Sequence, residues 1–452
     1  MILEVNELTQ LFPKKQGAAS DQIQLGSVMT DSRKTAKQSL FVPIVGENFD
    51  AHDFLGDAIK QGAVATLWQE DQPLPKLTPT DFPVFFVEDT TKALQQLASY
   101  YLKKVDPVVV GVTGSNGKTT TKDLAASVLQ VKYKTHKTAG NFNNHIGLPL
   151  TVLAMDPETE AVVLEMGMDR AGEISVLSKL AEPSYAIITN IGESHIENLG
   201  SREGIAGAKL EITEGLSEEG ALILDGDEPL LQEQNSKNWT VTCGFGDELD
   251  YQAEILQLTD ESSTFKVGEQ SFELPMAGKH NVKNATYVIA LAERLGLSPQ
   301  EIQQGFQQLQ MSAMRFEKHE GHKGSLIIND AYNASPTSMK AIIEVVSQLT
   351  SKSRKVLILG DMFELGEQSE KLHQSVADAI DEKIHAVYTI GEYSKTISDA
   401  VDKQYPSIET HHFTEKQTLS HHVRKNLTAD TVVLIKASRG MKLEELLENL
   451  VD

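Results

Sequence analysis

Short runs of apolar residues, each followed by polar residues, recur through the middle of the chain. They cover residues 107–112, 161–164, 186–188 and 221–224. Each run is too short for a buried helix, and helical patterns lie between the runs. Strands buried on both faces have this composition, and their alternation with helices is typical of a parallel sheet built from βαβ units. We therefore predict a parallel-sheet α/β domain over residues 107–312.

The last third of the chain starts the same pattern again. Between its apolar runs, Leu372, Val376 and Ile380 recur four residues apart, which predicts a helix with one buried face. We predict a smaller α/β domain of Rossmann-like architecture over residues 313–452. Its expected strands are residues 326–328, 356–359, 386–390 and 431–435.

Two further regions depart from this pattern. Residues 263–267 and 271–274 flank a turn that contains Gly268, which predicts a small hairpin appended to the central domain. The N-terminal region carries the strand-like runs 40–42 and 84–87 in a mixed α/β sequence. A chain of 452 residues, at roughly 150 per domain, is expected to have three domains. We place the first of them over residues 1–106.

Composition narrows the class of protein. The chain has 41 Lys and Arg against 64 Asp and Glu, a net charge of −23, which argues against a sequence-independent nucleic-acid binder and a polybasic membrane anchor. The single cysteine, Cys243, can form neither an intramolecular disulfide nor a cysteine-based metal site. No run approaches the ~18 apolar residues of a membrane span, and the start of the chain lacks the features of a signal peptide. We expect a monomeric, cytoplasmic enzyme that neither binds nucleic acid nor inserts into a membrane.

A glycine-rich segment follows the first predicted strand of the central domain and precedes a helical pattern. In such a loop the backbone N–H groups surround phosphate oxygens, and the helix N-terminus adds a favourable dipole. Lys118 can reach the β- and γ-phosphates, and Thr119 or Thr120 can hold Mg²⁺. Val112 stands where the strict G-x-x-x-x-G-K-[ST] pattern has glycine, so we predict a variant nucleotide-binding loop rather than a mere turn before a helix. Its residues are Gly114, Ser115, Asn116, Gly117, Lys118, Thr119 and Thr120.

Five isolated polar residues are candidates for the same chemistry, although each also has a simpler structural interpretation. Glu165 ends one predicted strand and His195 follows another, and carboxylate oxygens suit Mg²⁺. Lys209, taken alone, is typical of a solvated helix lysine. Arg315 lies near a domain boundary, where it could contact a γ-phosphate from another domain or form a surface ion pair. Asp330 could hold ribose or phosphate, or it could cap the next helix.

Taken together, nine short strings resemble the ATP-dependent Mur ligases of bacterial cell-wall synthesis. They run in family order over about three quarters of the chain. TGSNGKTTTKD and GKHNVKNA are shared with the wider superfamily, which includes folylpolyglutamate synthases. GNFNN, DAYNASP and GDMFELG are similar to the strings of the member that adds D-alanyl-D-alanine. The nine strings occupy residues 113–123, 140–149, 165–174, 190–201, 278–285, 315–317, 329–336, 360–366 and 436–444.

The resemblance implies an amide ligase that uses ATP and Mg²⁺. ATP would phosphorylate the terminal carboxylate of UDP-N-acetylmuramoyl-tripeptide, and the amine of D-alanyl-D-alanine would attack the resulting acyl phosphate. Phosphorylation is needed because a carboxylate oxygen is a poor leaving group, whereas phosphate is a good one. The protein's task would be positioning and charge neutralisation. The N-terminal domain would bind the uridine nucleotide, and the C-terminal domain would close on ATP and bind the dipeptide.

The resemblance also implies roles for individual residues. Lys118, His195, Lys209 and Arg315 match catalytic positions, and Lys209 matches a lysine that family members carry as a carbamate. The implied metal positions are Thr119, Glu165, His195 and Lys209. The remaining implied contacts are Asn281 and Asn284 with adenine, Arg315 and Asp330 with phosphate and ribose, Asp31, Ser32 and Arg33 with the uridine nucleotide, and Asn141, Asn143 and Asn144 with the muramoyl part of the substrate.

Two other functions stay open on the sequence alone. One is a different amide ligase of the superfamily, which adds a single amino acid or makes folylpolyglutamate. The predicted N-terminal domain of about 106 residues argues against the folate enzyme, which lacks it. The other is a non-catalytic ATP-binding protein, because a fold alone never establishes an activity. The joint presence of Lys118, Glu165, His195, Lys209 and Arg315 argues against a pure binder, which has no need of groups for phosphoryl transfer.

Overall fold

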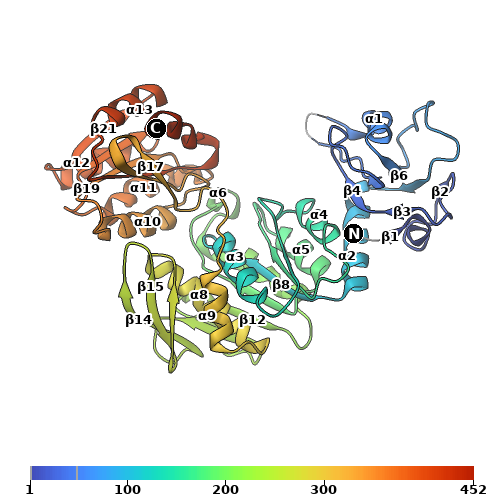
Figure 1. The fold of residues 1–452 in the computed structure, drawn as a ribbon, viewed down its shortest axis with the longest axis horizontal. Coiled ribbons are helices and arrows are strands. Elements are labelled where there is room, and N and C mark those ends of the chain that lie inside the picture. The colour runs from blue at the N-terminus through green and yellow to red at the C-terminus, as the bar shows by residue number, and fades with distance from the viewer. Residues whose placement is uncertain (1–2, 47–48) are drawn as a thin grey trace.

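Three mainly parallel sheets follow one another along the chain in the computed structural model, which describes residues 3–46 and 49–452. Helices flank each sheet, and Figure 1 shows the N-terminal and C-terminal domains at opposite ends of the central one. The predicted fold class, α/β with three domains, is confirmed. A further short antiparallel pair is formed by β1 (Leu3–Glu4) and β3 (Gln24–Leu25).

The N-terminal sheet has the strand order β2-β7-β6-β5-β4, in which β2 is antiparallel to its neighbour and the other pairs are parallel. The predicted strands 40–42 and 84–87 correspond to β5 and β7. The last helix, α2, packs against α4 (Gly147–Leu153) and α5 (Glu173–Ala181) of the central domain, and the Tyr101 hydroxyl donates to the Met155 carbonyl at 3.0 Å. The bounds are β2 Lys15–Gln16, β4 Ser27–Met29, β5 Ser39–Phe41, α1 Leu55–Lys60, β6 Ala63–Gln69, β7 Val84–Val87 and α2 Thr90–Val105.

The central sheet has the order β16-β15-β14-β13-β12-β11-β8-β10-β9. The strands from β9 to β14 are parallel, and β14, β15 and β16 are antiparallel, so the predicted hairpin and all four predicted parallel strands occur. Helices α3, α8 and α9 pack on one face of the sheet, and α4, α5 and α7 pack on the other. The bounds are β8 Val108–Thr113, α3 Lys118–Leu129, β9 Thr135–Lys137, α4 Gly147–Leu153, β10 Ala161–Glu165, α5 Glu173–Ala181, β11 Tyr185–Ile188, α6 Ile196–Leu199, α7 Arg202–Leu210, β12 Ala221–Asp225, β13 Thr240–Gly244, β14 Tyr251–Leu258, β15 Ser263–Val267, β16 Gln270–Leu274, α8 Lys279–Arg294 and α9 Pro299–Gln307.

The C-terminal sheet has the order β17-β18-β22-β19-β20-β21, in which β17 is antiparallel to β18 and the other pairs are parallel. The four predicted strands correspond to β18, β19, β20 and β22. The bounds are β17 Glu317–Gly321, β18 Ser325–Asn329, α10 Pro336–Gln348, β19 Arg354–Gly360, α11 Ser369–Gln374, β20 Ala386–Ile390, α12 Lys395–Gln404, β21 Glu409–Phe413, α13 Lys416–Lys425, β22 Thr431–Lys436 and α14 Leu447–Leu450.

The helix predicted from Leu372, Val376 and Ile380 differs in the structure. Helix α11 ends at Gln374, a 3₁₀ turn follows over Ser375–Ala379, and Ile380 is extended. The Ser375 hydroxyl donates to the Leu372 carbonyl at 2.8 Å, and such a bond competes with the helical backbone pattern. Val376 and Ile380 are buried but Leu372 is only half-buried, so the prediction of one regular helical face was wrong.

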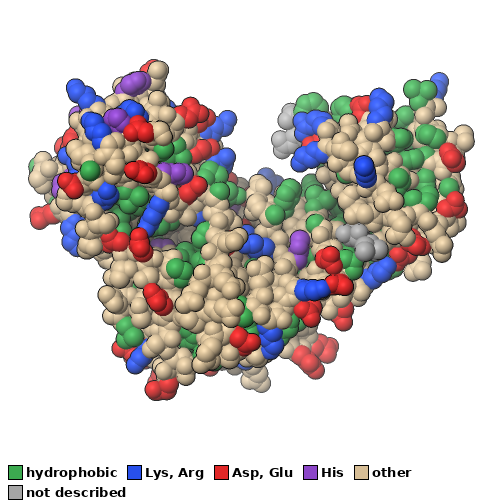
Figure 2. Space-filling view, in the orientation of Figure 1, with side chains coloured by type: hydrophobic (Ala, Val, Ile, Leu, Met, Phe, Trp, Pro, Cys, Tyr) green, Lys and Arg blue, Asp and Glu red, His purple; other side chains and the backbone are tan. Residues whose placement is uncertain are grey.

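The central and C-terminal domains touch beside the glycine-rich loop. The Ser335 hydroxyl donates to Oδ1 of Asn116 at 2.9 Å, and the Thr337 hydroxyl donates to a carboxylate oxygen of Glu193 at 2.7 Å. Figure 2 shows that the molecule is hollowed between its N-terminal and C-terminal domains. Across residues 3–46 and 49–452, no helix is both long and apolar enough to cross a membrane.

Candidate active site

Two glycines shape the loop between β8 and α3. Gly114 has φ 146° and Gly117 has φ 78°, values in the region that favours glycine. A Cβ atom at Gly114 would lie 1.8 Å from the Thr189 hydroxyl oxygen, so the approach of the segment after β11 excludes a side chain there. Helix α3 begins directly after Gly117, and its first backbone N–H groups are therefore available to an anion.

The segment after β11 holds this loop in place. The Asn190 carbonyl accepts from the Ser115 N–H at 3.0 Å, and the Asn190 side-chain oxygen accepts from the Asn116 N–H at 2.9 Å. The Gly192 N–H donates to the Ser115 hydroxyl at 2.8 Å. The sequence analysis assigned no role to Asn190. In the string that contains it, residues 190–201, only His195 was predicted to be functional.

Lys118 lies folded over its own loop. Its ammonium donates to the Gly114 carbonyl at 2.8 Å. Burial lowers the pKa of Lys118, the carboxylate of Glu165 opposes this shift, and the nearby Arg315 guanidinium reinforces it. The lysine is thus close to both a carboxylate and an arginine.

Polar side chains surround Glu165 at the end of β10. One carboxylate oxygen accepts from the Thr119 hydroxyl at 2.9 Å, and the other accepts from the Asn143 amide at 2.9 Å. The Glu165 side chain is buried, and its own N–H donates to the Thr138 hydroxyl at 2.9 Å. Of the two threonines considered as metal ligands, Thr119 therefore lies next to the carboxylate. A hydroxyl and a carboxylate in contact form a set of hard oxygen donors of the kind that Mg²⁺ prefers.

Lys209 is buried at the end of α7, with only 1% of its surface exposed. Burial lowers its pKa well below the ordinary value, and the positive charge of Lys118 lowers it further. No carboxylate of residues 3–46 or 49–452 forms an ion pair with it. An amine in these surroundings is stable in its neutral form, so the expectation of a solvated lysine, drawn from Lys209 alone, was wrong.

His195 lies in the central domain and contacts the C-terminal domain. It has φ 64° and directly precedes α6. Its Nδ1 forms an ion pair with a Glu364 oxygen, and it lies 3.3 Å from an Asp169 oxygen. The contact with His195 lowers the pKa of Glu364. His195 thus has two carboxylates as neighbours, one of which comes from the GDMFELG string of the other domain.

The C-terminal domain contributes a second group of charged residues. Arg315 stacks on the Tyr332 ring, with its guanidinium carbon 4.3 Å from the ring centre, and its Nη2 lies 3.5 Å from the Thr119 hydroxyl. The Asp330 carboxylate accepts from the Phe316 N–H at 3.0 Å and from the Lys436 ammonium. Sequence reasoning missed Lys436 although it opens the last of the nine strings, because its contact with Asp330 joins two strands that are distant in sequence.

A cavity of about 720 Å³ lies between the central and C-terminal domains. Every residue expected to bind ATP lines it except Gly114, whereas Glu165, His195 and Lys209 lie outside its lining. His280, which sequence reasoning did not select, also faces the cavity, and burial lowers its pKa to about 4. The expected residues in the lining are Ser115, Asn116, Gly117, Lys118, Thr119, Thr120, Asn281, Asn284, Arg315 and Asp330.

The expected substrate residues lie away from this cavity. Asn143 contacts Glu165 as described, Asn141 is exposed, and the Asn144 side chain accepts from the Gly147 N–H at 2.8 Å, at the start of α4. In the N-terminal domain, Arg33 donates two hydrogen bonds to Asp31 at 2.8 and 3.0 Å, and they lower the pKa of Asp31 to about 2. Ser32, between them, is half-buried.

Comparisons with known proteins agree with this arrangement. The domain family described as "Mur ligase family, catalytic domain" matches residues 25–102, "Mur ligase middle domain" matches 112–292, and "Mur ligase, glutamate ligase domain" matches 314–439. A relative from Bacillus subtilis (strain 168), named UDP-N-acetylmuramoyl-tripeptide–D-alanyl-D-alanine ligase, is 48% identical over 96% of this chain and 94% of its own length. The chain belongs to the Mur ligase family. The family predicted from the nine strings is confirmed.

Solved structures support the same placement of this Mur ligase. MurF from Acinetobacter baumannii superposes with a TM-score of 0.88 at 29% identity, covering 99% of this chain and 98% of that chain. MurF ligase from Thermotoga maritima in complex with ADP gives a TM-score of 0.80 at 28% identity, covering 93% and 96%. The similarity therefore extends over all three domains of this Mur ligase.

Proposed function

We propose that this Mur ligase joins D-alanyl-D-alanine to the terminal carboxylate of UDP-N-acetylmuramoyl-tripeptide, with hydrolysis of ATP, in the cytoplasmic synthesis of peptidoglycan precursors. The observation that carries the proposal is the cavity between the central and C-terminal domains. A phosphate-binding loop faces it from one domain, and Arg315 reaches the Thr119 hydroxyl from the other. The 48% identity to a ligase with this substrate in its name supports the choice of substrates.

The reaction starts with phosphoryl transfer. The N–H groups of the loop and of the first turn of α3 bind the ATP phosphates, and Lys118 leaves the Gly114 carbonyl to pair with them. Arg315 neutralises the charge of the γ-phosphoryl group as it moves to the substrate carboxylate. The products of this step are ADP and an acyl phosphate.

Amide formation follows. The amine of D-alanyl-D-alanine attacks the acyl carbon, a tetrahedral intermediate forms, and its collapse breaks the bond to phosphate. The amine loses a proton in this step, and inorganic phosphate leaves. Water must be excluded until the dipeptide is bound, because water would hydrolyse the acyl phosphate. The closure of the C-terminal domain on ATP would provide that exclusion.

The oxygen donors around Glu165 fit a magnesium ion. The Thr119 hydroxyl and the Glu165 carboxylate are hard oxygen ligands in direct contact. The family resemblance adds His195 and a carbamate on Lys209 as the further ligands. A bound Mg²⁺ would supply charge neutralisation to the phosphates. His195 is held by Glu364 and Asp169, so these two carboxylates set the position of its ring.

A carbamate on Lys209 is supported by the surroundings of that residue. Carbamylation needs a neutral amine, which adds to carbon dioxide with release of one proton. Burial beside Lys118 favours the neutral amine. The product is an anion that stabilises the neighbouring Lys118 ammonium and offers oxygen to Mg²⁺.

The division of labour among the domains is part of the proposal. Residues 1–106 would bind the uridine nucleotide through Asp31, Ser32 and Arg33. Residues 107–312 would bind ATP and face the muramoyl part through Asn141, Asn143 and Asn144. Residues 313–452 would bind the dipeptide.

A substrate panel tests the function. We expect release of ADP and phosphate to require both the UDP-tripeptide and D-alanyl-D-alanine, and mass spectrometry to find their amide. Preference for a shorter UDP-peptide with a single amino acid would point to another ligase of the family. ATP binding without any product would favour a non-catalytic protein.

A further inference from the structure

Two groups of three metal-binding side chains occur in the described part of the chain, with their ligand atoms within 4.8 Å of one another. The first, Asp169, His195 and Glu364, belongs to the active site. The second consists of Glu409, His411 and His422, which we call the histidine cluster. It lies in the C-terminal domain, and none of its members lines the ATP cavity.

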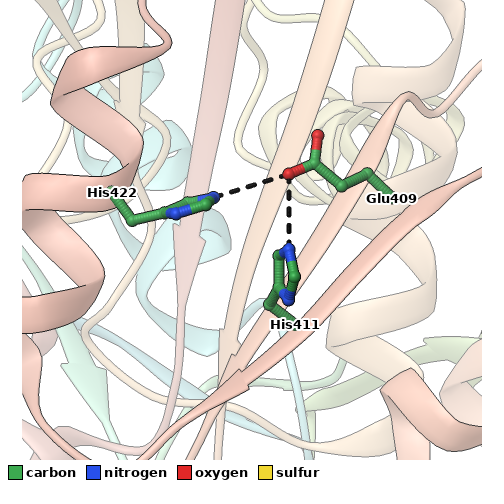
Figure 3. Close-up of side chains that lie close together, drawn as sticks. All are labelled: Glu409, His411 and His422. Carbon is green, nitrogen blue, oxygen red and sulfur yellow. Dashed lines mark ion pairs between the residues drawn. The ribbon is translucent and has the colours of Figure 1, made fainter.

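The fold brings the histidine cluster together from two elements. Glu409 and His411 are two residues apart on β21, the edge strand of the sheet, so they share one face of that strand. His422 comes from α13, which packs beside β21. His412 lies between the two strand residues and points to the opposite face, where its Nδ1 is 3.0 Å from the Thr389 hydroxyl. Figure 3 shows both imidazole rings directed at one Glu409 oxygen.

Two of the three spacings among the ligand atoms are close to those of a tetrahedral metal site. Oε1 of Glu409 is 3.4 Å from Nε2 of His422 and 3.7 Å from Nε2 of His411. Zinc bonds to nitrogen and oxygen of about 2.0–2.1 Å place neighbouring ligands ~3.3 Å apart. The two distances to Oε1 are therefore within about 0.4 Å of this value, and the two histidine nitrogens lie within 4.8 Å of each other. Nε2 of His422 is buried and makes no hydrogen bond in the described structure, which leaves its ring nitrogen available.

Neighbouring side chains fix the carboxylate and one ring. The Tyr388 hydroxyl donates to Oε1 of Glu409 at 2.9 Å, and the Tyr388 ring stacks on His411 at an angle of 22°. Arg354 lies 3.5 Å from the other carboxylate oxygen, Oε2, and so pairs on the side away from the histidines. The side chain of His411 is 52% exposed, which gives an ion a route of entry and leaves a fourth position open to water.

We propose that the histidine cluster is a binding site for a divalent transition-metal ion of the zinc class, separate from the active site. Two imidazoles and one carboxylate favour Zn²⁺, Co²⁺, Ni²⁺ or Cu²⁺ over Mg²⁺ and Ca²⁺, which prefer all-oxygen sites. The bound ion joins the edge strand β21 to α13. Because it binds only the folded arrangement, it stabilises the C-terminal domain.

The test uses the full-length protein carrying His195→Ala, which removes the histidine of the other group, in excess Mg²⁺. Titration with Co²⁺ is followed by visible absorption, and equilibrium dialysis counts Zn²⁺ per chain. We expect one equivalent with the absorption of a low-symmetry Co²⁺ site. Adding His411→Ala or His422→Ala should weaken binding at least about tenfold. The matched control is His421→Ala, the neighbouring histidine on α13, whose Nδ1 contacts the Gln417 carbonyl.

Thermal unfolding provides the second measurement. Zn²⁺ should raise the melting temperature of the His195→Ala protein and of the His421→Ala control, but not that of the His411→Ala or His422→Ala proteins. If an alanine variant fails to fold, Glu409→Gln removes the charged ligand while keeping its shape. The proposal is overturned if the His195→Ala protein binds no Co²⁺ or Zn²⁺. It is equally overturned if the cluster variants bind as tightly as the control.

Discussion

The central and C-terminal domains each bury a lysine, and the two lysines have opposite surroundings. Lys209 of the central domain is 1% exposed and has a like charge, Lys118, as its electrostatic neighbour. Lys436 of the C-terminal domain is 2% exposed but forms an ion pair with Asp330 and donates to the Asn333 carbonyl at 3.0 Å. Burial lowers the pKa of both lysines, and only for Lys436 does a carboxylate oppose the shift.

The difference shows how one residue type serves two purposes. Lys436 keeps a partner that stabilises its charged form, so it holds Asp330 in position and adds positive charge to the cavity. Lys209 has no such partner among residues 3–46 and 49–452 and is stable as a neutral amine, which can react. Strongly perturbed pKa values cluster at functional sites, and structural ion pairs such as Lys436–Asp330 also perturb them. The comparison predicts different responses to substitution, which can be measured.

The largest effect is expected at Lys118, whose charge acts on Lys209 and is itself affected by Arg315. Lys118→Ala should lower kcat/KM about 10³-fold or more, because a charge that follows the transferred phosphoryl group contributes several kcal/mol in the transition state. The far-UV circular dichroism and the melting temperature should stay close to wild type. Near-normal turnover in the folded variant would remove the loop from the mechanism.

Lys209→Ala should reduce activity about 100-fold if the proposed carbamate is a metal ligand. Acetate or formate should restore part of the activity, because either carboxylate can occupy the space left by the proposed carbamate. Lys436→Ala is the matched control and should gain nothing from acetate or formate, since Lys436 is proposed to act as a cation. Labelling with ¹³CO₂ should give a carbamate signal in wild type but not in Lys209→Ala. An unmodified amine in active enzyme would contradict the proposal.

The sequence was most informative where local chemistry dictates the structure. The buried strands β8, β10, β11 and β12 are continuous apolar runs, and Gly114 and Gly117 have backbone angles that favour glycine. Strands that are polar and partly exposed were missed. One is β21, whose sequence ETHHF lies at a sheet edge and has no run of apolar residues.

The contacts that complete the site could not be predicted in the same way. Asn190 beneath the loop, Glu364 beside His195 and Lys436 beside Asp330 join segments that are far apart in sequence. The strings that contain these residues could be recognised. The spacing within one string does not predict which residues of another string its side chains will contact. That no described carboxylate pairs with Lys209 likewise depends on which segments the fold brings around it.

The two lysines should also differ in their effect on stability. Lys436→Met leaves the Asp330 charge without its partner and should cost about 2 kcal/mol of unfolding free energy. Lys209→Met, the matched control, should be neutral or stabilising when carbon dioxide is removed, because it leaves no charge unpaired. Chemical denaturation measures both. The double variant Lys436→Met with Asp330→Asn should recover much of the loss. Equal costs at the two positions would show that the contrast in surroundings has no energetic consequence.

The smallest effect concerns pH and His280, which faces the cavity from α8 near Asp330 and Lys436. Burial lowers its pKa from 6.5 to about 4 in the folded protein. The unfolded chain therefore takes up a proton at a higher pH than the folded protein does. The contribution of neutral His280 to the free energy of unfolding is complete above pH 6.5 and is lost as the pH falls toward 4, with about 1 kcal/mol lost between pH 7 and pH 5.5.

His280→Gln should remove this part of the pH dependence in denaturation curves, whereas replacing the exposed His145 by Gln should leave it unchanged. Identical pH profiles for wild type and His280→Gln would mean that the cavity admits enough water, or enough of the Asp330 charge, to keep the imidazole near its ordinary pKa.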